Sequence, residues 1–97
     1  MAVIETMTFT LQAAADVEAF LSADRRLQVE FAYQQPGLVR RTTARDGDGG
    51  WIVIDLWESA ADVDAMGPRW DADPVAAAFM AFVDAESVDV HRYETLD

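Results

Sequence analysis

The sequence predicts an α+β domain in which a four-stranded antiparallel sheet carries helices on one of its faces. Segments whose apolar residues recur with the period of two typical of strands alternate with segments of helical period. A glycine-rich turn joins two of the strand segments directly, as in a β-hairpin. The chain has 97 residues, which suits one thin core, so residues 1–97 are expected to form a single domain.

The first part of the chain is expected to be a strand followed by helical structure. Residues 1–11 alternate between two faces and contain several β-branched side chains, which predicts a strand. Residues 14–35 space their apolar side chains as a helix does. They are expected to form one helix or two helical pieces, the second capped by Ser22 or Asp24. The Pro-Gly pair at residues 36–37 ends this region, because proline cannot continue a helix.

A hairpin is expected next. The strand segments 38–45 and 51–57 flank the turn Asp-Gly-Asp-Gly-Gly at residues 46–50. The second of these strands, W-I-V-I-D-L-W, is apolar on both faces apart from Asp55. Such a pattern is typical of a central strand that is covered on both sides.

Two helices and a strand complete the chain. Ser-Ala-Ala-Asp at residues 59–62 resembles a capping box and predicts a helix that stops near residues 67–68, Gly-Pro. Asp-Pro at residues 73–74 starts another helix, since Asp is a preferred cap and Pro suits the first turn. Trp70 is then expected in the loop between the two helices, and residues 88–96 are expected to form the last strand.

The element order β-α-β-β-α-β determines the topology. Right-handed crossovers place both helical layers on one face of the sheet, whose strand order is then 4-1-3-2, as in ferredoxin-like domains. The opposite face would be bare in a monomer, although the third strand is apolar on that side too. Burial against the sheet of a second copy covers such a face, so a homodimer is expected.

The chain resembles the antibiotic-biosynthesis monooxygenase-like family of dimeric α+β barrels. The resemblance covers nearly the whole chain and is strongest in Q-Q-P-G-L-V-R-R at residues 34–41, D-G-D-G-G-W-I-V-I-D-L-W at residues 46–57 and H-R-Y-E at residues 91–94. It implies a dimeric α+β barrel and a cofactor-independent monooxygenase that acts on a small aromatic or polyketide-like substrate. Trp57 lies where the family often has an aromatic residue at the end of a strand, which implies a part in substrate binding.

The other functional residues of the family are not found here. Active members often use an Asn near a Trp, and this chain has no Asn. Haem-degrading members resemble one another in an axial His on a helical segment, whereas the single His of this chain, His91, falls in a predicted strand. No pair of His residues has metal-ligand spacing. We therefore expect no metal and no cofactor.

Composition excludes further classes of function. Without Cys or Lys, the chain has no thiolate metal site, cysteine nucleophile or Schiff-base lysine. Its net charge of -11 repels phosphate backbones, which argues against a nucleic-acid partner. No apolar run approaches the roughly 18 residues of a membrane span, and residues 1–11 lack the pattern of a signal peptide. A cytoplasmic protein with no membrane partner is therefore expected.

Catalytic candidates are few. His91 is the natural general base, because it alone titrates near neutral pH without perturbation. Tyr33 or Tyr93 would donate a hydrogen bond to a developing oxyanion. The alternative is that His91 is an ordinary strand residue.

Aromatic side chains suggest a binding cavity between the helices and the sheet. Trp57, Trp70 and Phe79 are the candidates to hold a flat aromatic ligand there, with Tyr33 and Phe82 beside them. The alternative for each Phe is plain core packing. Trp70, in its expected loop, would serve as a lid or as a dimer contact.

Asp55 is expected to form an ion pair with an Arg on the neighbouring strand, since a buried carboxylate needs charge-assisted hydrogen bonds. If residues 46–50 form the whole loop, Arg41 lies opposite Asp55, and a loop one residue shorter places Arg40 there instead. The alternative is a solvated Asp near a sheet edge.

Two functions from different classes therefore remain open. One is the cofactor-independent monooxygenase, and the other is a non-catalytic homodimer that binds a small molecule or serves a structural role. A cavity that reaches Trp57 and His91 favours the enzyme, whereas a fully packed interface between helices and sheet favours the second.

Overall fold

The computed structural model describes residues 1–96. Its elements follow the predicted β-α-β-β-α-β order, with short 3-10 turns added. In chain order they are β1 (Val3–Thr10), α1 (Val17–Glu30), η1 (Ala32–Gln34), β2 (Leu38–Arg45), β3 (Gly50–Trp57), α2 (Ala60–Ala72), α3 (Pro74–Met80), η2 (Ala85–Ser87) and β4 (Asp89–Glu94).

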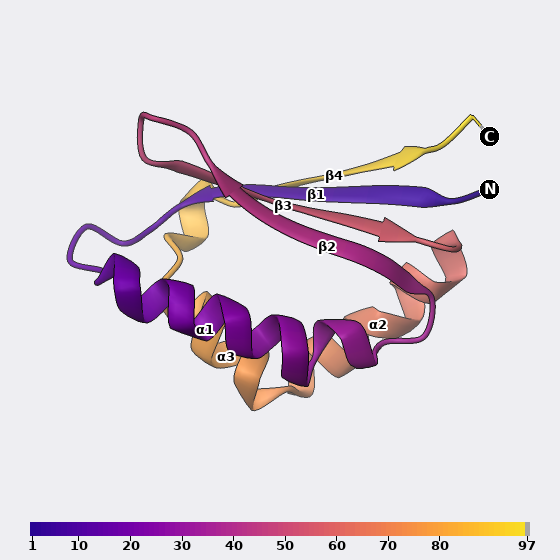
Figure 1. Cartoon of the computed structure of the whole chain (residues 1–97), viewed down its shortest axis with the longest axis horizontal. Helices are drawn as coiled ribbons and strands as arrows, with labels where there is room; N and C mark the ends of the chain where they lie inside the picture. The colour runs from indigo at the N-terminus through magenta and orange to yellow at the C-terminus, as the bar shows by residue number, and fades with distance from the viewer. Residues whose placement is uncertain (97) are drawn as a thin grey trace.

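The four strands form one antiparallel sheet in the order β2-β3-β1-β4. This is the predicted order 4-1-3-2 read from the other edge. Figure 1 shows α1, α2 and α3 together on one face of the sheet, while no element of the described chain covers the other face. The ferredoxin-like fold is therefore confirmed.

The hairpin between β2 and β3 forms as the turn signal predicts. The Asp46 carboxylate accepts hydrogen bonds from the backbone N–H groups of Asp48 and Gly50, at 2.7 and 3.0 Å. Gly49 has a φ of 87°, a conformation that glycine adopts without a steric penalty. The resulting register pairs Arg41 with Asp55 across the two strands, as expected for the full-length loop.

Helix α1 is a single helix, the first of the two expected alternatives, and neither Ser22 nor Asp24 caps a second piece. Asp16 is the N-cap, and its carboxylate accepts hydrogen bonds from the N–H groups of Glu18 and Ala19. Asp24 lies in the middle of α1 and is buried beneath the sheet. Its side chain makes long-range contacts there instead of capping a helix.

Helix α2 runs past residues 67–68, where the sequence predicted its end. Pro68 lies inside the helix, and α2 continues to Ala72, so Trp70 is helical rather than part of a loop. Asp73 then ends α2 and caps α3, as predicted. The ring of Trp70 packs edge-on against Phe31, with centroids 5.7 Å apart. This tertiary packing favours the last turn of α2 despite the hydrogen bond that Pro68 cannot donate.

The core lies between the sheet and the helices, in two clusters. The larger is built around fully buried Phe20, Leu27 and Phe79, and the smaller joins Val3 and Val63 to Trp57 at one end of the sheet. Between these clusters the packing is incomplete. None of the described helices has the length and apolar character needed to cross a membrane.

Candidate functional site

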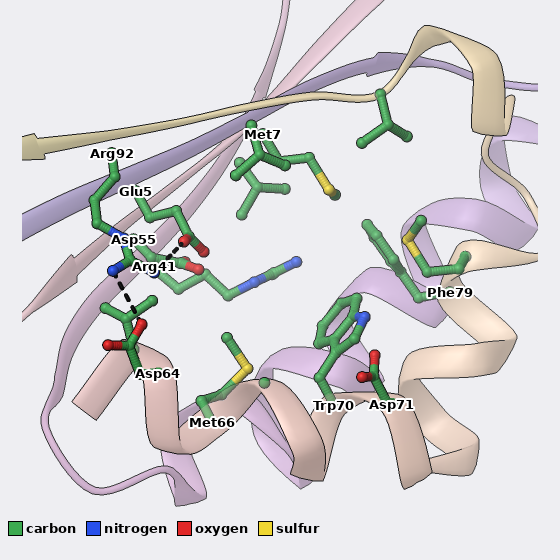
Figure 2. A pocket seen from close by; sticks show the side chains of 16 residues that line it. Glu5, Met7, Arg41, Asp55, Asp64, Met66, Trp70, Asp71, Phe79 and Arg92 are labelled. Atoms are coloured by element: carbon green, nitrogen blue, oxygen red, sulfur yellow. Dashed lines mark hydrogen bonds and ion pairs between the residues drawn. The ribbon is translucent and has the colours of Figure 1, made fainter. Parts of the chain in front are cut away.

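A cavity of about 480 Å³ separates α2 and α3 from the sheet. Figure 2 shows the side chains that point into it from both layers. Much of its wall is apolar, as in typical small-molecule sites. The apolar lining includes Met7, Val53, Val63, Met66, Trp70 and Phe79.

A row of four charged side chains crosses the sheet at one level of this cavity. Arg41 of β2 lies opposite Asp55 of β3, Asp55 lies opposite Glu5 of β1, and Glu5 lies opposite Arg92 of β4. All four line the cavity (Figure 2). The order of charges is positive, negative, negative, positive, so the two carboxyl groups are direct neighbours.

Asp55 is the most perturbed group of this row. Burial raises the pKa of its carboxyl group from 3.8 to about 6, since an ionised carboxylate is poorly solvated there. The charge of Arg41 lowers this pKa, whereas the negative charges of Glu5 and Asp24 raise it further. The Oδ1 atom is buried and has no hydrogen-bond partner among the described residues. Asp55 as a whole is half-buried and lines the cavity, so its carboxyl group can accept a hydrogen bond from a ligand there.

Glu5 is held by a cation at the opposite end of the row. The guanidinium of Arg92 lies 3.7 Å from Glu5 and 3.0 Å from Asp64 of α2, which ties the sheet to that helix. Burial raises the pKa of Glu5, and the positive charge of Arg92 partly offsets this effect. Glu5 thus forms a salt bridge, whereas none of the salt bridges among residues 1–96 involves Asp55.

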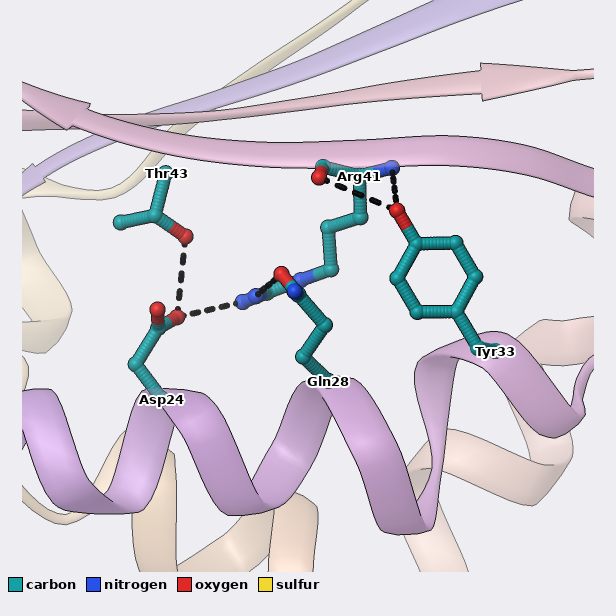
Figure 3. A network of polar contacts seen from close by, with 5 residues as sticks. All are labelled: Asp24, Gln28, Tyr33, Arg41 and Thr43. Carbon is teal, nitrogen blue, oxygen red and sulfur yellow. Dashed lines mark hydrogen bonds and ion pairs between the residues drawn. The ribbon is translucent and has the colours of Figure 1, made fainter.

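The predicted ion pair between Asp55 and Arg41 is not formed. Arg41 instead donates a hydrogen bond to Asp24 of α1 at 2.8 Å and another to Gln28 at 3.3 Å (Figure 3). Thr43 adds a third contact, because its hydroxyl donates to the same Asp24 oxygen at 2.9 Å. The register was predicted correctly, but the long Arg41 side chain extends to the helix layer, where two acceptors lie one turn apart.

Arg41 also forms part of the cavity. Its side chain is only 4% exposed, and its guanidinium carbon lies 5.7 Å from the centre of the Phe79 ring. Figure 2 shows the guanidinium extending into the space bounded by Met7, Trp70 and Phe79. Among the hydrogen bonds of the described residues, none uses the Nε–H of Arg41. A cation with an available donor therefore lies beside the unpaired carboxyl group of Asp55.

The predicted aromatic residues divide between the cavity and the core. Trp70 and Phe79 line the cavity. Trp57 does not, because it is 2% exposed and packed beneath the start of α2 against Val63 and Met66. The expectation that Trp57 lies in the cavity wall is therefore not met. Phe82 packs against the larger core cluster from its edge.

His91 and Tyr93 lie on the other face of the sheet. Successive side chains of β4 point to opposite faces of the sheet. Val90 and Arg92 point into the cavity, so His91 and Tyr93 point outward. The ring of His91 is exposed, lies 3.0 Å from Asp89 and stacks on Tyr93. His91 therefore cannot reach a ligand in the cavity as a general base.

Tyr33 also lies outside the cavity lining. Its hydroxyl oxygen accepts a hydrogen bond from the backbone N–H of Arg41 at 2.8 Å and donates to the Arg41 carbonyl at 3.3 Å (Figure 3). Tyr33 thereby joins η1 to β2. Its predicted role as a donor to an oxyanion in the cavity is not supported by this placement.

Sequence reasoning missed Glu5 and Arg92 as site residues and misassigned Asp55 as half of a structural ion pair. The sequence does contain one signal for this site. Glu5 and Asp55 occupy alternate positions that otherwise hold core residues, so both carboxyl groups had to face the helices. Two acidic residues at core-facing positions of adjacent central strands indicate a site. Among the described residues, no group of three or more His, Cys, Asp or Glu side chains has the arrangement of a metal site.

Comparison with known proteins shows likeness in structure alone. No family model matches the chain. No curated protein matches it either.

The structural similarity extends over the whole fold. SnoaB, a cofactor-independent oxygenase from Streptomyces nogalater, aligns with a TM-score of 0.75 and 22% identity, over 99% of this chain and 94% of that chain. A protein described as an antibiotic biosynthesis monooxygenase aligns with a TM-score of 0.76 and 16% identity, over 98% and 99% of the two chains. A dimeric ferredoxin-like protein of unknown function from Jannaschia aligns with a TM-score of 0.73 and 14% identity, over 98% and 100%. The fold implied by the sequence resemblance is the fold of these proteins.

Proposed function

We propose that the chain binds a small aromatic, polyketide-like molecule in the cavity between helices and sheet and acts on it as a cofactor-independent monooxygenase. The cavity reaches neither Trp57 nor His91, so the observation that carries this proposal is a different one: the cavity combines a largely apolar wall with the half-buried carboxyl group of Asp55, whose Oδ1 has no hydrogen-bond partner among the described residues. Structural likeness to SnoaB, itself a cofactor-independent oxygenase, supports the choice of reaction.

The cavity suits a flat, mostly apolar substrate. Trp70 and Phe79 provide ring faces and edges, and the Met side chains of the wall adapt to irregular shapes. Oxygen chemistry without a cofactor requires a substrate that becomes electron-rich when it loses a proton. Binding and deprotonation are then the two tasks of the protein, and the cavity has residues for both.

The test combines oxygen consumption with a variant that fills the cavity. Gly67 lines the cavity, and a Cβ built at this position meets no heavy atom within 4 Å. Gly67→Phe should therefore remove aromatic binding and turnover while α2 stays folded, because replacing a helical glycine favours the helix. Gly47→Phe is the matched control, since Gly47 lies in the hairpin turn and is equally open.

The measurement is oxygen uptake with a panel of phenolic and quinone-type compounds. We expect uptake with wild type and Gly47→Phe and its loss in Gly67→Phe. If no compound is oxidised but several bind in the cavity, the non-catalytic small-molecule binder is the better description. Equal uptake by the Gly67 and Gly47 variants would show that the cavity is not the reaction site.

We further propose a cytoplasmic homodimer that forms through the sheet face away from the helices, closing the α+β barrel. Ile54 is 37% exposed and Tyr93 54% exposed on that face, and Ile4 and Ile52 lie beside them. The Jannaschia protein of the same fold is dimeric. Sedimentation should show a dimer for wild type and a monomer for Ile54→Glu, because a charge in the centre of an apolar interface lacks a partner. A wild-type monomer at micromolar concentration would contradict this assembly.

A further inference from the structure

We propose that Asp55 is the base of the cavity and that Arg41 holds the oxyanion it generates, so that the substrate is an aromatic ketone with an acidic C–H group next to its carbonyl. This inference rests on the proposed binding of an aromatic molecule in the cavity. It goes beyond that proposal because it names the proton acceptor and the chemical class of the substrate.

The geometry supports this division of roles. Asp55 and Arg41 are cross-strand neighbours that both line the cavity, yet they do not form an ion pair with each other. Asp24 fixes the guanidinium of Arg41 from the helix layer, while Oδ1 of Asp55 is left without a partner. A base and a cation side by side, both anchored in secondary structure, can hold a proton and an oxyanion on adjacent substrate atoms.

The chemical step is an enolisation. The C–H bond next to the carbonyl breaks, and its proton passes to the carboxylate of Asp55. The electron pair of that bond forms a C=C bond, and the carbonyl π pair moves to oxygen, which becomes an enolate oxyanion beside Arg41. No electron leaves the substrate, so the step requires no oxidant, and the electron-rich enolate is the form that would react with oxygen afterwards.

Other charged groups around Asp55 favour this assignment. Burial in the cavity raises the pKa of Asp55 to about 6, which lies close to the range in which a general base works best at neutral pH. Glu5 has Arg92 as its partner and is less available. The charged groups that act on Asp55 are Arg41 of β2, Glu5 of β1 and Asp24 of α1. The other charged residues of the cavity lining are Arg92 of β4 and Asp64 and Asp71 of α2.

Exchange of hydrogen for deuterium tests the proposal without oxygen. β-Tetralone carries an acidic CH₂ group between its aromatic ring and its carbonyl, and NMR in anaerobic D₂O measures the exchange at that carbon. Wild-type protein should accelerate exchange about 100-fold over buffer, and Asp55→Asn should lose this acceleration. The control is Asp48→Asn, which removes an exposed carboxylate of the hairpin turn, outside the cavity lining, and should keep the wild-type rate.

The pH profile provides a second readout. The wild-type exchange rate should rise from about pH 5 to about pH 7 and then level off, as expected for a base with this pKa. Arg41→Lys keeps the charge but changes the donor geometry, so it should lower the rate without moving the profile.

The outcomes separate this inference from the proposed function. Full exchange activity in Asp55→Asn, or no exchange with β-tetralone bound in the cavity, overturns the role of Asp55. Exchange that depends on Asp55, without any oxygen uptake, supports the base and overturns the monooxygenase. If β-tetralone does not bind in the cavity while compounds of the phenolic and quinone-type panel do, the ketone substrate is wrong and the proposed function stands.

Discussion

Replacing Asp55 with Asn should stabilise the protein at neutral pH. In the folded state the side chain of Asp55 is half-buried, its Oδ1 atom is buried without a hydrogen bond from the described residues, and its pKa is raised from 3.8 to about 6. The folded state therefore binds more protons than the unfolded state between these two values. Stability that depends on this group is fully present below about pH 4 and is lost as the pH rises through about 6.

The size of the effect follows from the two pKa values. Each pKa unit corresponds to 1.36 kcal/mol, so a rise from 3.8 to about 6 corresponds to about 3 kcal/mol of unfolding free energy. Asn is neutral at every pH and has nearly the same shape. Asp55→Asn should thus equal wild type near pH 4 and exceed it by about 3 kcal/mol above about pH 7.

Urea denaturation of both proteins at a series of pH values measures this difference. Asp46→Asn is the control of opposite sign, because backbone hydrogen bonds from Asp48 and Gly50 lower the pKa of Asp46. Wild type should be at least as stable as that variant, and its advantage should not shrink as the pH rises from about 3 to 7. If the difference in unfolding free energy between wild type and Asp55→Asn does not change with pH, the pKa of Asp55 is not raised by burial.

Three further variants test the contacts around the cavity and the helix starts. Asp24→Ala should cost about 3–5 kcal/mol of unfolding free energy, because it leaves the buried guanidinium of Arg41 without its carboxylate. Glu30→Ala, which removes the exposed ion pair with Arg26, should cost less than about 0.5 kcal/mol in the same urea titration. Equal losses of stability in Asp24→Ala and Glu30→Ala would contradict the view that burial makes the Asp24–Arg41 pair the more important one. Asp73→Ala should lose about 1 kcal/mol, since Asp73 caps α3, and an unchanged urea midpoint would exclude that capping role.

The fold could be predicted from the sequence because local signals agreed with one another. The period of two in residues 3–10, the turn at residues 46–50 and the Asp-Pro start at residues 73–74 each specify one structure. The end of α2 was mispredicted for a tertiary reason. A Gly-Pro pair normally stops a helix, but here the packing of Trp70 against Phe31 favours another turn.

The site was harder to predict than the fold. Trp70 and Phe79 were predicted as ligand-binding residues, and both line the cavity, although their binding role is a proposal. His91 was chosen because it is the only histidine of the chain, whereas the alternation of β4 places it on the opposite face. A pKa of about 6 at Asp55 arises from burial and neighbouring charges in three dimensions, which the sequence does not encode locally. The partner of Arg41 likewise depends on tertiary packing. Arg41 donates to Asp24 of α1 and not to Asp55, its neighbour across the strands.

Both the proposed function and the role of Asp55 require that the ligand binds in the cavity, and the three tryptophans of the chain allow a direct test. NMR signals of the indole N–H groups can be assigned with a Trp70→Phe variant and followed while β-tetralone is added. The Trp70 signal should shift with saturation, whereas the signals of Trp51 and Trp57, which are packed in the two core clusters, should move little. A Trp70 signal that stays still while the ligand binds, or a response confined to His91 on the outer face, would contradict the cavity as the site.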